Sequence, residues 1–301
     1  MSVMEFYVGV GVAVMAMGSI LLNCLLLCVV LTIRNRKLEL NFSIALAVFG
    51  IIKPAITLST TAFVLVTNPD ASLMNQACRV KGPFDFICTF ANMALVAIVA
   101  RLRCSTVLGK AIHTAECVAF GTFSVMYSCV IGVVGFNDLF RASPSGVDCS
   151  SSSSENISSA VLVFLLGFAL LLFSAVALVS YFSILYFLKS QYATLNKEHS
   201  TNLIPKNTPA LRPVFIRTLA VCSIFFFFVI PASILIMVES TTTIPPFLSL
   251  AISICLALDA LANPCLVLFA HSVIYSRLKL YIRRLSQTTS DASSQCSYPS
   301  P

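Results

Sequence analysis

Long apolar stretches, separated by short polar connections, run through the whole chain. Four stretches contain no charged residue and three contain one each: 6–33, 117–137, 156–188 and 218–238 in the first group, and 40–69, 82–100 and 240–276 in the second. A helix needs roughly 20 apolar residues to cross the hydrocarbon core of a bilayer, and only helices or closed barrels cross it with every backbone group hydrogen-bonded. These stretches are too long and too uniformly apolar for barrel strands. The pattern predicts an all-α membrane protein, built as a bundle of seven transmembrane helices.

We expect the seven helices at 7–33, 41–66, 76–108, 114–136, 160–188, 213–238 and 245–270. Beyond them, apolar residues recur on one helical face and basic residues flank them, which is typical of a short amphipathic helix on a membrane surface. This eighth helix is expected at 272–285, with the apolar residues Ile274, Leu278, Tyr281, Ile282 and Leu285. The chain would then form one membrane domain, 1–285, followed by a disordered Ser- and Thr-rich tail, 286–301.

Charge is scarce and unevenly distributed. The chain is 58% hydrophobic and 10% charged, with a net charge of +7. Alternate connections hold 15 of the 19 basic residues: Arg34, Arg36, Lys37, Arg101, Arg103, Lys110, Lys189, Lys197, Lys206, Arg212, Arg217, Arg277, Lys279, Arg283 and Arg284. The positive-inside rule makes this side cytoplasmic and the N-terminus extracellular. The basic excess therefore reflects membrane topology and not nucleic-acid binding. Because 1–5 lacks a basic region, we expect the first apolar stretch to stay as an anchor and not to be cleaved as a signal.

The predicted topology also sorts the 12 cysteines. Eight fall inside helices, where we expect them to be buried as small apolar side chains: Cys24, Cys28, Cys88, Cys117, Cys129, Cys222, Cys255 and Cys265. Cys104 and Cys296 face the reducing cytoplasm, which leaves Cys78 and Cys149 on the oxidising side and predicts a disulfide between them. The outer loop also contains the glycosylation sequon at Asn156. Its closeness to the next helix leaves both a glycosylated and a sterically blocked Asn156 open.

Several short motifs occur in order along the predicted helices. The first helix has Asn23 at the end of Gly18-Ser19-Ile20-Leu21-Leu22-Asn23, and the second has Ile44-Ala45-Leu46-Ala47. Cys78 precedes Arg103 by 25 residues, Phe225 precedes Pro231 by six, and the last helix contains Asn263-Pro264. With these motifs the chain, except for its tail, resembles the rhodopsin-like (class A) G-protein-coupled receptors. The resemblance implies a plasma-membrane receptor that senses an extracellular ligand and signals to a heterotrimeric G protein, with arrestin as a further partner of the tail.

The chain departs from that family at several positions that relay activation. Gly50 replaces the acid of the second helix, and Leu102 replaces the acid beside Arg103. Val229 occupies the position of the family's tryptophan before Pro231, and Val267 occupies the position of its tyrosine after Asn263-Pro264. Because Arg103 then has no acidic neighbour in the third or sixth helix, we expect raised basal activity or none at all. The resemblance implies that Arg103, Phe225, Pro231 and Pro264 carry activation and G-protein coupling; the alternative for Arg103 is an ordinary arginine of the cytoplasmic side.

A candidate ligand site is centred on Asp85, seven residues after Cys78. In amine-binding relatives an acid at this spacing pairs with the ligand, and an acid at membrane depth is expected to be functional. Lys53 is expected at a similar depth, so an internal Lys53–Asp85 pair and a ligand-facing Asp85 both stay open. Ala232 and Ser233, which follow Pro231, complete the expected ligand-binding set.

A second polar group lies deeper. By resemblance, Asn23, Asn92, Asp259 and Asn263 line a pocket that holds a sodium ion in many relatives. Asp259 is then either a relocated replacement for the acid lost at Gly50 or a protonated acid hydrogen-bonded to Asn23 or Asn263.

Other kinds of function have less support in the sequence. We find no catalytic group, phosphate-binding loop or resident metal site, so an enzyme is not expected. The rival function is a seven-helix ion or proton transporter or channel that uses Lys53, Asp85 and Asp259 as its path. A receptor-fold protein that no longer signals is the third alternative.

Overall fold

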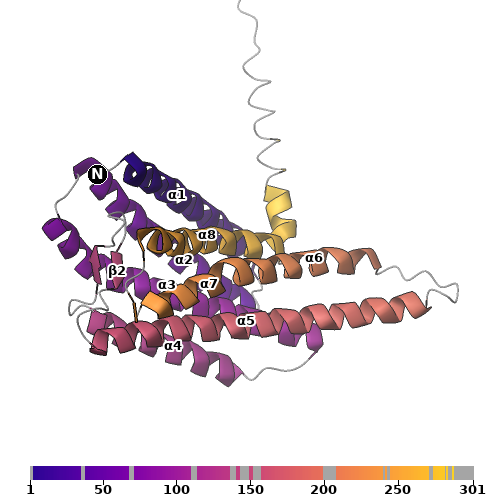
Figure 1. Cartoon of the computed structure of the whole chain (residues 1–301). Helices are drawn as coiled ribbons and strands as arrows, with labels where there is room; N and C mark the ends of the chain where they lie inside the picture. Colours follow the sequence, from indigo (N-terminus) through magenta and orange to yellow (C-terminus); the bar gives the residue numbers. More distant parts are fainter. Residues whose placement is uncertain are drawn as a thin grey trace, which may run out of the picture.

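The chain forms an elongated bundle of long helices. The computed structural model describes residues 3–34, 38–67, 71–109, 114–135, 140–142, 149–151, 157–198, 208–239, 241–242, 245–270, 274–281, 283 and 287. Its elements are α1 (Val3–Leu31), α2 (Leu38–Thr67), α3 (Ala71–Leu108), α4 (Thr114–Gly135), β1 (Phe140–Ala142), β2 (Cys149–Ser151), α5 (Ile157–Glu198), α6 (Thr208–Ile224), η2 (Phe225–Val229), α7 (Ile230–Glu239) and α8 (Pro246–Ala270). Figure 1 shows the long helices side by side, with the short strands at one end.

Six helical spans in the described part of the chain are long and apolar enough to cross a membrane. They lie in α1, α2, α3, α5, the continuous helix from α6 through η2 to α7, and α8. The chain is therefore a multi-pass membrane protein. The 22-residue helix α4 occupies the remaining predicted range. A seventh crossing by α4 stays a prediction.

Helix α3 lies at the centre of the bundle. In its most apolar window 67% of residues are buried, against 28% in α2 and 33% in α1 and α8. Phe90 on α3 is fully buried and packs edge-on against Phe173 of α5, with ring centres 4.9 Å apart. The outer faces of the surrounding helices are apolar and exposed, as expected for lipid contact. Cys24 and Cys28 belong to such a face of α1, contrary to the expectation that they are buried.

The helix that contains Pro231 includes one wider turn. At η2 the backbone N–H of Ile230 donates to the carbonyl of Phe225, five residues earlier, in place of the usual four. Pro231 lacks an N–H and its ring clashes with the carbonyl four residues before it, so the regular ladder breaks here. Such single π-turns are frequent at functional sites. The helix therefore accommodates Pro231 by means of a π-turn.

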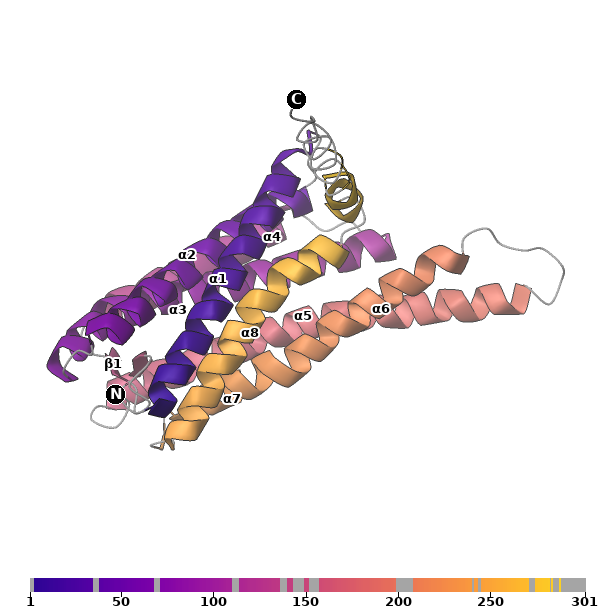
Figure 2. The ribbon, with the colours of Figure 1, turned by 90° about the horizontal axis from the view of Figure 1, so that it is seen from above.

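The two strands lie at the same end of the bundle as the start of α1 (Figures 1 and 2). They pair antiparallel, with Ala142 opposite Cys149. A disulfide joins Cys149 to Cys78 near the start of α3, with the two Cα atoms 5.4 Å apart. The predicted pairing is present, and it fastens the hairpin across this end, which we call the disulfide end.

At the other end, which we call the Arg103 end, α5 and α6 run side by side beyond the rest of the bundle (Figures 1 and 2). Helix α5 has 42 residues and is therefore about 63 Å long. It was predicted to stop at 188, where the apolar pattern stops. It continues to Glu198 because the following residues include good helix formers such as Gln191, Ala193 and Leu195.

After α8 the chain forms another short helical segment at 274–281. Ile274 and Leu278 are buried, whereas Tyr281 is half exposed. The basic residues Arg277, Lys279 and Arg283 are exposed, which agrees with an amphipathic segment. Ile282, Leu285 and Asn156 lie outside the described residues, as does the tail apart from Gln287. The membrane-surface position of this segment stays a prediction.

Candidate functional site

A cavity of about 1180 Å³, including its open mouth, lies between the helices toward the disulfide end. Helices α1, α2, α3, α5, α7 and α8 contribute to its wall, and Cys149 of β2 joins them. Most of the wall is apolar, with five hydroxyl-bearing residues: Ser19, Thr57, Thr89, Ser249 and Ser253. Lys53, Asp85 and Glu239 add charge. A largely apolar cavity with a few polar groups is the usual form of a small-molecule site.

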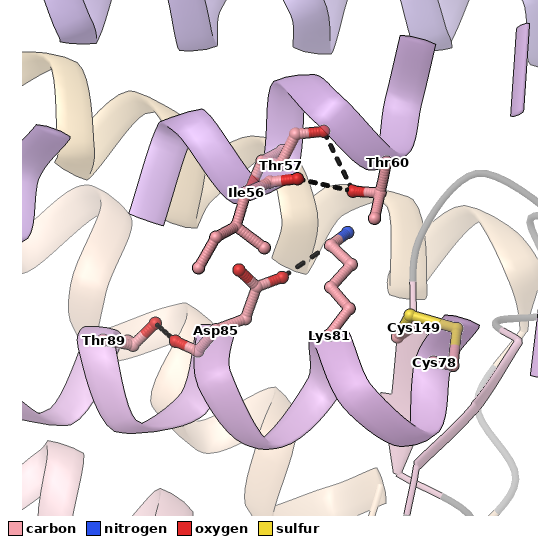
Figure 3. A network of polar contacts seen from close by, with 8 residues as sticks. All are labelled: Ile56, Thr57, Thr60, Cys78, Lys81, Asp85, Thr89 and Cys149. Carbon is pink, nitrogen blue, oxygen red and sulfur yellow. Dashed lines mark hydrogen bonds and ion pairs between the residues drawn. A yellow bond between two sulfur atoms is a disulfide. The ribbon is translucent and has the colours of Figure 1, made fainter. Parts of the chain in front are cut away.

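Asp85 forms an ion pair with Lys81, one turn away on the same helix. The Lys81 Nζ and the Asp85 Oδ2 are 3.4 Å apart, and the side chains are 3% and 21% exposed. Figure 3 shows both side chains directed from α3 toward α2, with the disulfide on the next turn. Residues four apart lie on one helical face, so this pairing follows from local geometry. It replaces the internal Lys53–Asp85 pair, which is absent from the described structure.

Lys53 lies on α2 and also lines the cavity. It forms no hydrogen bond or ion pair with any residue that the structure describes. It interacts electrostatically with the buried Asp259. Lys53 therefore brings a positive charge to the cavity wall that no direct partner neutralises.

Ala232 and Ser233, the other expected ligand-binding residues, do not line this cavity. Both are 1% exposed, and the Ser233 hydroxyl donates to the Val229 carbonyl at 2.8 Å. Ile236 and Glu239, nearer the disulfide end of α7, line the cavity instead. The expected position on this helix was therefore about one turn too far from the disulfide end.

Asn23 occupies the space that the absence of a side chain at Gly50 leaves open. Its Nδ2 donates to the Gly50 carbonyl at 3.1 Å and to the Ser19 carbonyl at 2.9 Å. A Cβ atom at position 50 would lie 2.5 Å from the Asn23 Oδ1. The Ser19 hydroxyl in turn donates to the Ala260 carbonyl at 2.9 Å. Glycine at position 50 thus lets Asn23 and Ser19 join α1 to both α2 and α8.

Asp259 and Asn263 interact as their spacing predicted. The Asn263 Nδ2 donates to the Asp259 Oδ2 at 3.1 Å. The Asp259 Oδ1 and the Asn92 Oδ1 are buried and have no hydrogen-bond partner within the described part of the chain. Carboxylate and amide oxygens are the ligands that a hard cation prefers. The chemistry of these residues therefore fits a sodium ion.

Arg103 has an acidic partner after all. Its Nε lies 2.6 Å from the Oε1 of Glu39, in the first turn of α2, and the two side chains are 13% and 15% exposed. The expectation that Arg103 lacks an acid was wrong, because it considered only α3 and α6. Glu39 comes just before the predicted second helix and Arg103 near the end of the predicted third, both on the predicted cytoplasmic side, which was the available signal.

The Arg103 side chain borders a second, smaller cavity of about 300 Å³. Its Nη2 is buried without a hydrogen-bond partner among the described residues. The sequence had already singled out five residues of its wall: Leu46, Arg103, Phe225, Asn263 and Val267. The structure adds Val96, Val99, Tyr181 and Val221. Arg103, Phe225 and Asn263 therefore share one site, which Val267 completes with an apolar side chain.

Comparisons with known proteins support the fold. No family model matches the sequence, and no curated protein sequence is significantly similar to it. The crystal structure of squid rhodopsin matches the structure with a TM-score of 0.65 and 14% sequence identity, covering 99% of this chain and 93% of that chain. The chain therefore has the rhodopsin-like receptor fold, as its motifs predicted.

Proposed function

We propose that the protein is a plasma-membrane receptor that binds an extracellular ligand in the cavity at the disulfide end. It signals to a heterotrimeric G protein at the Arg103 end. The observation that carries this proposal is the pair of cavities at opposite ends of one rhodopsin-like bundle. The disulfide supports an extracellular position for its end, and the basic connections support a cytoplasmic position for the other.

The helix formed by α6, η2 and α7 links the two cavities. Ile236 and Glu239 touch the larger cavity and Phe225 the smaller one, with the π-turn between them. A ligand that shifts α7 bends this helix at the π-turn and changes the packing around Phe225. The Glu39–Arg103 pair holds the inner ends of α2 and α3 in the resting state, and its opening frees Arg103 for the G protein. This is a rigid-helix movement about a local hinge.

The polar group between the cavities has a supporting role in this proposal. A sodium ion held by Asp259 and Asn92, near Asn263 and Asn23, would neutralise the acid in the resting state. The Ser- and Thr-rich tail is proposed to contact arrestin.

A panel of G-protein biosensors in cells tests the receptor proposal without knowledge of the ligand. The unmodified chain, Glu39→Gln and Arg103→Ala are compared at equal surface expression. We expect Glu39→Gln to raise the basal signal of at least one G protein, because Arg103 loses its charged partner, and Arg103→Ala to abolish that signal. Silence of Glu39→Gln with every G protein would contradict G-protein coupling. An ion current or flux that depends on Lys53, Asp85 or Asp259 would favour the transporter or channel.

A further inference from the structure

We propose that the ligand of the larger cavity is an amphipathic organic acid, with one carboxylate that pairs with Lys53 and an apolar body that packs against the wall. This inference rests on the proposed ligand-binding function of the cavity. It departs from the amine chemistry that the sequence resemblance implied for Asp85.

The pairing of the charged side chains, and not the sum of their charges, favours an anion beside Lys53. Asp85 already has an ammonium partner in Lys81, at 3.4 Å, so a ligand amine would have to compete with a nearly buried lysine. Glu239, at the last residue of α7, has interactions of its own. Lys53 has no direct partner in the described structure. A partly buried ammonium without a counter-ion is costly, and a bound carboxylate offsets that cost.

The wall limits the ligand further. Thr57 lies one turn from Lys53 on α2 and supplies a hydroxyl group to the same cavity. This hydroxyl can donate to the second oxygen of a carboxylate, whereas the Ser19 and Thr89 hydroxyls already donate to the backbone carbonyls of Ala260 and Asp85. The remainder is built mainly from apolar side chains such as Phe86, Leu170 and Leu256. A single unpaired cation in an apolar cavity matches one negative charge on a hydrocarbon or aromatic body, and it does not match a polyanion or a sugar.

Sodium octanoate is a suitable probe because it carries one carboxylate on a short apolar chain. Purified protein in lipid nanodiscs is unfolded by heat with a thiol-reactive fluorophore, which reports exposure of the buried Cys88, Cys104, Cys117 and Cys222. Octylamine and 1-octanol are the matched cationic and neutral probes. A ligand that binds only the folded state raises the unfolding temperature with its concentration. We expect octanoate to stabilise the unmodified protein at lower concentration than either analogue.

Substitution of Lys53 tests whether octanoate binds through this lysine. We expect Lys53→Met to weaken octanoate binding by about ten- to a hundredfold, the usual effect of losing a charged hydrogen-bond partner, while Lys53→Arg retains most of it. Lys279→Met, in the exposed segment at 274–281, is the control for loss of a lysine and should bind as the unmodified protein does. Equal octanoate binding by Lys53→Met, or a preference of the unmodified protein for octylamine or octanol, would overturn the inference.

The test separates this inference from the proposed function, because no G protein takes part in it. Octanoate binding that needs Lys53 supports the ligand class even if every G-protein biosensor stays silent. A biosensor response to Glu39→Gln without Lys53-dependent binding would leave the receptor function standing and remove the ligand class. If Lys53→Met fails to fold, the inference is tested by which of the three probes stabilises the unmodified protein at the lowest concentration.

Discussion

Individual residues explain why α2 carries no acid at position 50. Gly50 has no side chain, and Asn23 fills the vacated space and bonds to the Gly50 carbonyl. An acid at position 50 is therefore excluded by packing as well as absent from the sequence. The acidic group of this region is Asp259 on α8, whose Oδ2 accepts a hydrogen bond from Asn263.

Gly50→Ala tests this packing. Its Cβ would lie 2.5 Å from the Asn23 Oδ1, and such overpacking in a buried site typically costs about 1–3 kcal/mol. We expect Gly50→Ala to lower the thermal unfolding temperature. The decrease should be smaller when the same substitution is made in the Asn23→Ala variant. Gly11→Ala is the matched control, because a Cβ there meets nothing within 4 Å and alanine favours the helix. If Gly50→Ala is as harmless as Gly11→Ala, Asn23 does not depend on the glycine.

The Lys81–Asp85 pair gives a second prediction at this scale. Asp85→Asn removes the carboxylate beside a Lys81 side chain that is 3% exposed, and leaving a buried group without its partner costs about 1–3 kcal/mol or more. We expect Asp85→Asn to unfold at a lower temperature than the double variant Lys81→Met with Asp85→Asn. The same substitution can be made in the Lys81→Met and Lys53→Met variants. If Asp85→Asn lowers the unfolding temperature by the same amount in both, Lys81 is not the partner of Asp85.

At the scale of elements, two close approaches set the positions of the helices that line the cavities. Ser19 and Asn23 join α1 to α8 and α2. Gly167 brings α5 against α7: a Cβ at this glycine would lie 2.5 Å from the Met237 Cγ and 3.0 Å from the Ser233 carbonyl oxygen. The second contact lies just beyond the π-turn, so α5 supports the part of α7 that faces the larger cavity.

Gly167→Val is expected to separate α5 from α7. Because two of the three atoms closest to this Cβ belong to the backbone, side-chain rotation alone cannot relieve the clash, and we expect a loss of roughly 1–3 kcal/mol in stability. Thermal unfolding in nanodiscs measures it, with Val161→Ala on the exposed face of α5 as the control substitution. An unfolding temperature unchanged by Gly167→Val would mean that the two helices are not in close contact.

For the whole molecule, the apolar pattern was sufficient to predict the helices, because membrane spans need long uncharged segments whatever their packing partners. The disulfide also followed, since topology left two cysteines on one side. The Lys81–Asp85 pair was accessible from the spacing of four but was passed over for Lys53. Glu39–Arg103 depends on how α2 and α3 are rotated against each other, and the choice of cavity-lining residues on α7 depends on the depth of the cavity along that helix. Neither leaves a trace in hydrophobic periodicity.

The Glu39–Arg103 pair is proposed to hold a resting state that opens at the Arg103 end. The most direct measurement is the distance between spin labels on cysteines introduced at Thr106 of α3 and Ile216 of α6, which are both exposed, with Cys24 and Cys28 replaced by serine. It needs neither the ligand nor the G protein. In Glu39→Gln we expect a second population in which the labels lie farther apart, by on the order of one helical turn, about 5 Å. Identical distance distributions with and without Glu39 would contradict it.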